Sequence, residues 1–202
     1  MLIVGIAGGS GAGKSTVVRK LMSCLPNDKI ALLPQDNYYR DSSHLPMAER
    51  QKLNFDHPAS IEFELLVNHV KQLIEGKPIE MPIYSYITCT RAKETITVAP
   101  CDVIIVEGIL ILTDEHLRQL LQIKVFVDAP PDDRLIRIIN RDILERGRNL
   151  QEALAHYQNR VKPMHQQFIA PTKSFADIIV PQGGNNQVAI QVLSSMILLN
   201  VQ

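Results

Sequence analysis

The sequence predicts an α/β protein built on a doubly wound, mostly parallel five-stranded sheet. Short runs rich in Ile and Val recur along the chain, and they lack the polar alternation of a strand with one face in water. Segments of helical periodicity separate these runs, and such alternation favours a parallel sheet with helices on both faces. The composition of the 202 residues, 46% hydrophobic and 21% charged, argues against a disordered chain and a coiled coil.

The elements follow in order along the chain. The five strands are expected at residues 2–7, 30–33, 103–106, 123–127 and 178–180. Helices are expected at residues 14–25, 61–75, 132–145, 150–168 and 187–199. Gly76 suits the end of the second helix, and Pro131 suits the first turn of the third. Pro163 falls inside the fourth helix, so a kink or two separate helices are expected there.

Two segments interrupt the alternation of strands and helices. Residues 82–86 and 94–98 are short β-like runs, which are expected to form a hairpin projecting from the sheet. Residues 35–60 form a polar connection that is too long for a simple chain reversal, and such connections are usually functional. No repeat, low-complexity tract or linker divides the sequence, so we expect a single domain over residues 1–202.

Charge and cysteine content limit the partners and the location. The 21 Lys and Arg residues balance 21 Asp and Glu residues, so no nucleic-acid or membrane partner is expected. Cys24, Cys89 and Cys101 form no metal-binding pair, and their odd number favours free thiols in a reducing compartment. With no secretion signal and no apolar run of membrane-spanning length, we expect a cytoplasmic protein.

The strongest motif is a glycine-rich loop, GGSGAGKS at residues 8–15, which matches G-x-x-x-x-G-K-[ST] between an expected strand and an expected helix. There, backbone N–H groups and the positive end of the helix can face a triphosphate. Lys14 is expected to reach the β and γ phosphates, Ser15 to bind Mg²⁺, and Thr16 to lie near the α phosphate. The expected ATP-binding residues are Gly8, Gly9, Ser10, Gly11, Ala12, Gly13, Lys14, Ser15 and Thr16.

Two carboxylates come directly after expected strands. Glu107 follows the strand at 103–106, at the sheet edge where ligands bind, and is expected to hold Mg²⁺ or one of its waters. Asp36 follows the second strand, and we expect it to accept the proton of an alcohol. Without the glycine-rich loop, each would be interpreted as a turn or capping residue.

Residues 132–149 contain five arginines and no lysine. Guanidinium groups bind phosphate oxygens bidentately, so these arginines are candidates to bind a phosphate. They are Arg134, Arg137, Arg141, Arg146 and Arg148. The alternative is a solvated helix with i,i+4 ion pairs such as Asp142 with Arg146, and we adopt that alternative for Arg134. Gly147 is the expected hinge of an arginine-rich lid that closes over ATP.

Other nucleotide-binding classes fit less well. A GTPase switch normally needs an N-K-x-D motif, which the sequence lacks, and no histidine pair has metal-binding spacing. From the residues alone, the interpretation stops at a small-molecule kinase.

The sequence resembles the uridine (uridine-cytidine) kinases among the P-loop kinases over essentially its whole length. The matching segments are GGSGAGKS at 8, PQDNYYRD at 34, NFDHP at 54, PIYSY at 82, EGILIL at 107, RDILERGR at 141 and PTKSFADIIVP at 171. The resemblance implies a P-loop kinase fold and phosphoryl transfer from ATP, or GTP, to a nucleoside 5′-hydroxyl. It also implies Asp36 as base, Mg²⁺ at Ser15 and Glu107, catalytic Lys14, Arg141 and Arg146, and a homotetramer or homodimer.

The same resemblance implies a nucleoside pocket formed by Tyr39, Asp56, Tyr84, Tyr86, Cys89, Arg148 and His156. Cys89 and His156 depart from the His and Gln that family members commonly carry at these positions. We therefore expect altered base selectivity, because a thiol is only a weak hydrogen-bond donor. Two alternatives remain, which are a P-loop kinase for pantothenate or a sugar phosphate, and a nucleotide-binding regulatory module without turnover.

Overall fold

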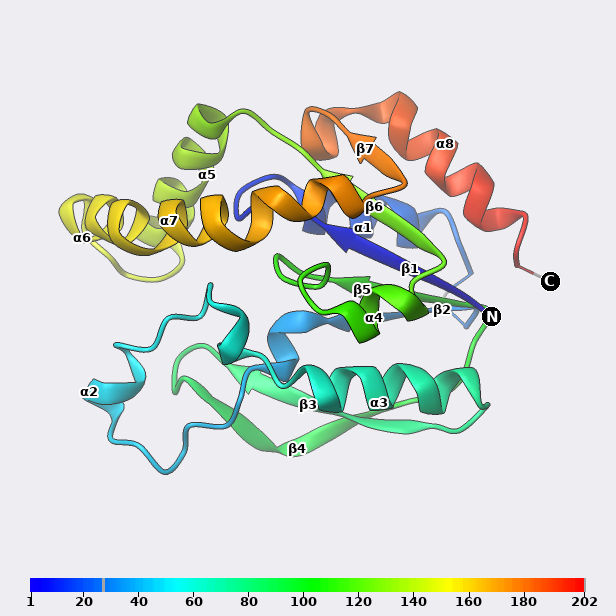
Figure 1. Ribbon diagram of the computed structural model, residues 1–202, viewed down its shortest axis with the longest axis horizontal. Coiled ribbons are helices and arrows are strands. Elements are labelled where there is room, and N and C mark those ends of the chain that lie inside the picture. Colours follow the sequence, from blue (N-terminus) through cyan, green and yellow to red (C-terminus); the bar gives the residue numbers. More distant parts are fainter. Residues whose placement is uncertain (27, 202) are drawn as a thin grey trace.

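A computed structural model describes residues 1–26 and 28–201, and its centre is one parallel sheet (Figure 1). The strands are β1 (Leu2–Ala7), β2 (Ile30–Pro34), β5 (Val103–Glu107), β6 (Ile123–Val127) and β7 (Ile178–Val180). Their order is β2-β5-β1-β6-β7, and every neighbouring pair is parallel. The five expected strands are confirmed, and so is the α/β class.

Both faces of the sheet are buried, which explains the absence of polar alternation. In β1, Ile3 contributes to the core on the face covered by α3 (Phe63–Ile74) and α4 (Glu115–Leu120). Its neighbour Val4 belongs to the core under α1 (Lys14–Ser23) and α8 (Gln187–Leu198). Burying apolar side chains on both faces is the main stabilising contribution to such a sheet.

The expected hairpin is present and is longer than its sequence signal. Strands β3 (Ile79–Ser85) and β4 (Thr90–Val98) pair antiparallel in a sheet of their own. Figure 1 shows this hairpin beside α3, away from the central sheet. One face of β3 is buried against the rest of the protein, so the hairpin is fixed to the body and carries residues towards the site.

The connection at residues 35–60 contains short helical turns at Gln35–Tyr38, Pro58–Ser60 and α2 (Met47–Arg50). α2 and α4 were not predicted, because four and six residues are too few for a periodic pattern. The signal for α4 was Asp114, whose side chain accepts a hydrogen bond from the backbone N–H of Leu117 and caps the helix.

The expected lid is formed by α5 (Pro131–Leu144) and the helical segment that follows it. That segment comprises α6 (Leu150–His156), a π-helical turn at Tyr157–Val161, α7 (Lys162–Met164) and a second π-helical turn at His165–Ile169. Of the two expectations at Pro163, a kink or two separate helices, the structure contradicts the second, because the chain stays helical through this residue (Figure 1). Pro163 has no backbone N–H to donate, and the π-helical turns on both sides of it replace the regular i→i−4 hydrogen bonds. No helix among the described residues has the length and apolar character to cross a membrane.

Candidate active site

The phosphate-binding loop (P-loop, residues 8–15) joins β1 to α1 at the carboxyl edge of the sheet. Gly11 and Gly13 have φ of 74° and 96°, a backbone region that favours glycine. Gly13 is the residue before Lys14, so the first turn of α1 opens directly from the loop. Free N–H groups and the helix dipole make this turn a site for phosphate groups.

Lys14 and Glu107 lie together at the floor of the site. The Lys14 ammonium is 3.8 Å from Glu107 Oε1 and donates to the carbonyl of Gly9 at 3.3 Å. Burial lowers the pKa of Lys14, although the nearby Glu107 and Asp36 carboxylates oppose the shift. Burial likewise raises the pKa of Glu107, and Lys14 opposes that shift. An incoming phosphate can compete with Glu107 for the lysine.

Asp36 reaches the same place from β2. Pro34 is in register with Glu107 across the β2–β5 pair, so the two carboxylates leave adjacent strands at the same edge. The next residue, Gln35, is buried and accepts a 2.7 Å hydrogen bond from the backbone of Leu110, which fixes this turn. The Tyr86 hydroxyl donates to Asp36 Oδ2 at 2.5 Å.

The oxygen donors at this edge suit Mg²⁺. They are the Ser15 hydroxyl and the Glu107 and Asp36 carboxylates, all of which line one cavity. No group of three His, Cys, Asp or Glu in the described part of the chain could hold a metal. Mg²⁺ in kinases usually has one or two protein ligands, with phosphates and waters completing its octahedron, and this donor set fits that pattern.

One cavity of about 1080 Å³ brings the expected site residues together. Its lining includes Ser10, Gly11, Gly13, Lys14, Ser15, Thr16, Asp36, Tyr39, Asp56, Tyr84, Tyr86, Cys89, Glu107, Arg141, Arg146, Arg148 and His156. Three expected ATP-binding residues do not line it. Gly8 would bring a Cβ within 2.3 Å of the Val127 carbonyl, Ala12 is in the core, and Gly9 packs against Arg134.

Aromatic rings form one wall of the cavity. The Tyr39 and Tyr84 ring centroids are 5.0 Å apart, and the Phe55 ring lies 5.1 Å from Tyr39. The Tyr84 hydroxyl is buried and has no hydrogen-bond partner among the described residues. Beside this wall, burial raises the pKa of Asp56, while His156 and Arg141 oppose the shift. A flat ring with polar edges and adjacent hydroxyls matches this chemistry.

The lid arginines meet at one buried carboxylate, which we call the Asp142 cluster: Asp142 with Arg141, Arg146, Arg148 and His156. Asp142 is fully buried, and its oxygens are 2.5 Å from Arg148, 3.4 Å from Arg141 and Arg146, and 3.2 Å from His156. Burial alone would raise the pKa of Asp142, but the His156 and Arg148 hydrogen bonds and the Arg141 and Arg146 charges hold it well below its usual range.

Sequence reasoning misplaced part of the lid. Arg134 was assigned to the solvated face of the helix, and the structure contradicts this, because Arg134 is only 4% exposed. The Asp142–Arg146 pair exists, but its carboxylate is buried. The buried stripe of α5 is Arg134, Ile138 and Asp142, each four residues apart. The spacing was the available signal, although spacing alone cannot distinguish a buried polar stripe from a solvated one.

Further lining residues were not assigned by sequence reasoning, among them Asn54, Phe55 and Arg160, whereas Arg137 was one of the expected phosphate-binding arginines. Arg137 donates to the Gly11 carbonyl at 3.0 Å and so contacts the P-loop itself. Arg160 donates to the Leu53 carbonyl at 2.7 Å and joins the lid to the polar connection. Phe55 and Asn54 belong to NFDHP, the segment that also supplied Asp56.

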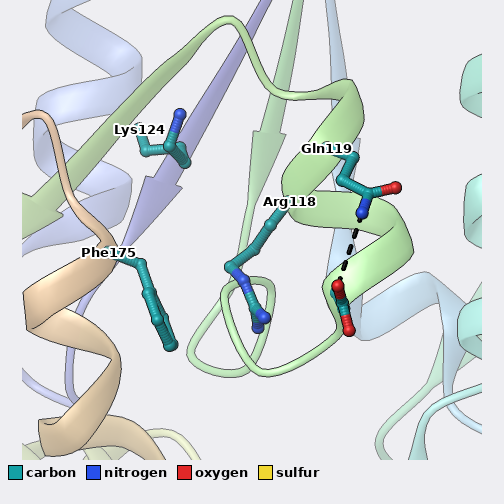
Figure 2. A pocket seen from close by; sticks show the side chains of 5 residues that line it. Arg118, Gln119, Lys124 and Phe175 are labelled. Carbon is teal, nitrogen blue, oxygen red and sulfur yellow. Dashed lines mark hydrogen bonds between the residues drawn. The ribbon is translucent and has the colours of Figure 1, made fainter.

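A second, smaller hollow of about 260 Å³ lies away from the P-loop, beside the start of β6 (Figure 2). Its lining residues are Glu115, Arg118, Gln119, Lys124 and Phe175. The Arg118 guanidinium stacks over the Phe175 ring at 4.2 Å and donates to the Leu112 carbonyl. None of the expected site residues belongs to this hollow.

A parallel sheet, a P-loop at its carboxyl edge and a neighbouring acid define the class of P-loop kinases. The chain belongs to the phosphoribulokinase / uridine kinase family, whose model matches residues 3–189.

Named relatives agree with this membership. The chain is 50% identical to a uridine kinase of Anoxybacillus flavithermus over 196 residues, which cover 97% of this chain and 93% of the relative. It is 47% identical to a uridine kinase of Streptococcus gordonii over the same shares of both chains.

Solved structures agree on the fold. Phosphoribulokinase from Rhodobacter spheroides superposes with a TM-score of 0.67 at 15% identity, over 89% of this chain and 69% of that one. D-glycerate 3-kinase from Cryptococcus neoformans gives 0.62 at 18% identity, over 90% and 86%.

Proposed function

We propose that this kinase transfers the γ-phosphoryl group of ATP to the 5′-hydroxyl of a pyrimidine nucleoside, uridine or cytidine. One observation carries the proposal: the P-loop, the Asp36 carboxylate and an aromatic wall beside the half-buried Asp56 carboxylate share a single cavity. Relatives named uridine kinase, about half identical over nearly the whole chain, support the choice of acceptor. We also propose that residues 1–202 act as a single domain.

Each catalytic residue is assigned a role that follows from its chemistry. Asp36 orients the nucleoside hydroxyl and accepts its proton, while Lys14 holds the transferred phosphoryl group. Arg141 and Arg146 stabilise the charge that develops on that group. Ser15 and Glu107 would hold Mg²⁺, which would supply positive charge to neutralise the triphosphate.

The acceptor is held by the opposite wall of the cavity. Asp56 accepts hydrogen bonds from the ribose hydroxyls, and the rings of Tyr39 and Tyr84 contact the base. Cys89, His156 and Arg148 complete the pocket, and Tyr86, whose hydroxyl donates to Asp36, lines the same cavity. A sugar phosphate would not need an aromatic wall, so the ring cluster favours a nucleoside over that acceptor.

One panel of assays tests the proposal. ADP formation is measured with ATP or GTP as donor, and with uridine, cytidine, pantothenate, ribulose 5-phosphate or no acceptor. We expect turnover with uridine or cytidine together with the matching 5′-monophosphate. Turnover with only pantothenate or ribulose 5-phosphate would show that the acceptor is not a nucleoside. No turnover with any acceptor would favour a regulatory module.

Two further predictions belong with the proposal. The resemblance to uridine kinases favours a homodimer or homotetramer, which light scattering on the purified protein measures directly. The balanced charge and the cysteine content favour a cytoplasmic location, which fractionation of the source cells tests.

A further inference from the structure

Arg134 lies directly behind the P-loop. It belongs to the buried stripe of α5 and is 4% exposed, although it does not line the cavity. A Cβ placed on Gly9 would meet Arg134 Nη1 at 1.8 Å and His165 Cε1 at 2.9 Å. Glycine at position 9 therefore lets a guanidinium group and an imidazole pack against the loop backbone.

The Arg134 guanidinium has different bonding partners from the guanidinium groups of the other lid arginines. Its Nη1 bonds to His165 Nδ1 at 3.1 Å, and no carboxylate of residues 1–26 or 28–201 lies within 4 Å of its guanidinium. The Asp128 carboxylate bonds to Lys173 at 2.5 Å instead. By contrast, Arg141, Arg146 and Arg148 share Asp142.

His165 suits the role of a neutral acceptor. Burial, together with the Arg134 and Lys14 charges, lowers the pKa of His165 to about 4, although the Asp128 carboxylate opposes the shift. A neutral imidazole can accept the Arg134 hydrogen bond at Nδ1, whereas an imidazolium cannot. Burial lowers the pKa of Arg134, while Tyr157 and the Asp128 carboxylate oppose the shift. An arginine remains protonated in such surroundings, so the protein keeps a buried cation without a carboxylate bonded to it.

We propose that Arg134 is a positioning residue whose buried charge, held behind the P-loop by His165, strengthens binding of the triphosphate through the loop. This inference rests on the proposed function, because it requires a nucleoside triphosphate at the P-loop. Lys14 lies on the same loop and donates to the Gly9 carbonyl, so both cations flank one peptide. The cost of removing the Arg134 charge from water is met when the protein folds. A triphosphate that binds at the P-loop is therefore attracted by a charge that is already in place and does not have to rearrange.

Calorimetric titration of the full chain with Mg·ATP and Mg·ADP, together with thermal unfolding of the nucleotide-free protein, tests the proposal. Arg134→Met removes the charge and keeps much of the volume, while Arg134→Lys keeps the charge. We expect Arg134→Met to weaken Mg·ATP binding about tenfold, and to weaken Mg·ADP binding less because ADP carries less charge. Arg134→Lys should stay within about threefold of the wild type for Mg·ATP.

A matched control is Arg118→Met, because Arg118 is a partly buried arginine in the small hollow of Figure 2, and its variant should bind both nucleotides normally. The nucleotide-free Arg134→Met protein should unfold no earlier than the wild type, since it loses a buried charge without a bonded anion. A merely structural arginine would instead lower the unfolding temperature.

Four results would overturn the inference: wild-type Mg·ATP affinity in Arg134→Met, an equal loss for ATP and ADP, an equal loss in Arg134→Lys, or a folded Arg134→Met protein that unfolds at a lower temperature than the wild type. If Arg134→Met does not fold, Arg134→Lys decides, since retained affinity supports the role of charge and lost affinity refutes it. A wild-type protein without Mg·ATP affinity would refute the proposed function itself.

Discussion

The Asp36 carboxylate faces the same cavity as Lys14 and accepts its hydrogen bond from Tyr86. Asp36→Asn preserves the shape and removes the proton acceptor, so we expect kcat to fall about 100-fold or more. Mg·ATP affinity, measured by titration, should stay close to that of the wild type. Asp41→Asn is the matched control, because Asp41 is exposed on the same connection and its variant should keep full activity. Normal turnover in Asp36→Asn would remove Asp36 from the reaction.

Cys89 is a second residue whose side chain should affect the reaction, through the choice of nucleoside base. It lines the cavity with φ of 51°, and its thiol donates to the Tyr86 carbonyl at 3.5 Å. Histidine tolerates positive φ better than most residues and offers stronger hydrogen bonds to a base edge. We expect Cys89→His to raise kcat/KM about tenfold for at least one of uridine and cytidine, and to change their ratio.

The Cys89 comparison needs steady-state kinetics with both nucleosides at saturating Mg·ATP. Cys24→His supplies the control, since Cys24 is exposed at the end of α1 and lies outside the cavity. Identical kcat/KM values in Cys89→His and the wild type would show that position 89 does not read the base.

Among the elements, α5 joins the arginines to the site through the Asp142 cluster. Asp142→Asn keeps the volume but removes the negative charge that three arginines share, and breaking a buried charge pair costs about 3 kcal/mol or more. We therefore expect a lower free energy of unfolding and, because the arginines lose their common anchor, a kcat/KM for nucleoside reduced about tenfold. Urea titrations and steady-state kinetics measure the two effects.

Asp133→Asn is the internal control for Asp142→Asn. Asp133 lies on the same helix, its side chain is 52% exposed, and it is 3.9 Å from Arg137. An exposed i,i+4 pair contributes less than about 0.5 kcal/mol, so this variant should behave like the wild type. If the two variants lose the same stability, the Asp142 cluster has no special role.

Elements that bury two apolar faces were predictable from sequence, and elements defined by other contacts were not. The runs at 103–106 and 2–7 contain no polar residue, so only a strand inside a layered fold suits them. Two features lay outside such patterns. α4 is too short for periodicity, and the π turns around Pro163 depend on tertiary packing.

At the scale of the whole molecule, the candidate site was largely predictable because parallel strands end at one edge. Asp36, Glu107 and the P-loop follow three adjacent strands, so topology alone brings them together. The positions of Arg134 and Asp142 depend instead on how α5 is rotated against the P-loop. Charged residues four apart occur on solvated and buried faces alike, so the sequence pattern could not distinguish these two orientations.

The stability of the whole molecule should depend on pH through His165. Its pKa is about 4 in the folded protein against an ordinary value of 6.5, because burial and the Arg134 and Lys14 charges outweigh the Asp128 carboxylate. Between about pH 6.5 and about pH 4, His165 is protonated in the unfolded chain but neutral in the folded protein. The free energy of unfolding therefore has its full value above about pH 6.5 and declines towards about pH 4. The decline should amount to about 2 kcal/mol between about pH 7.5 and about pH 4.5.

Urea unfolding of the wild type and of His165→Gln over that range isolates the effect of His165. Glutamine accepts the Arg134 hydrogen bond and does not titrate, so the variant should lose less stability on acidification. The other groups with shifted pKa values, including Asp56 and Glu107, are common to both proteins and cancel in the difference. Parallel pH profiles for the two proteins would mean that His165 takes up its proton at the same pH in the folded and unfolded states. In that case His165 would not be a neutral partner of Arg134 near pH 5, and the arginine would need another acceptor behind the P-loop.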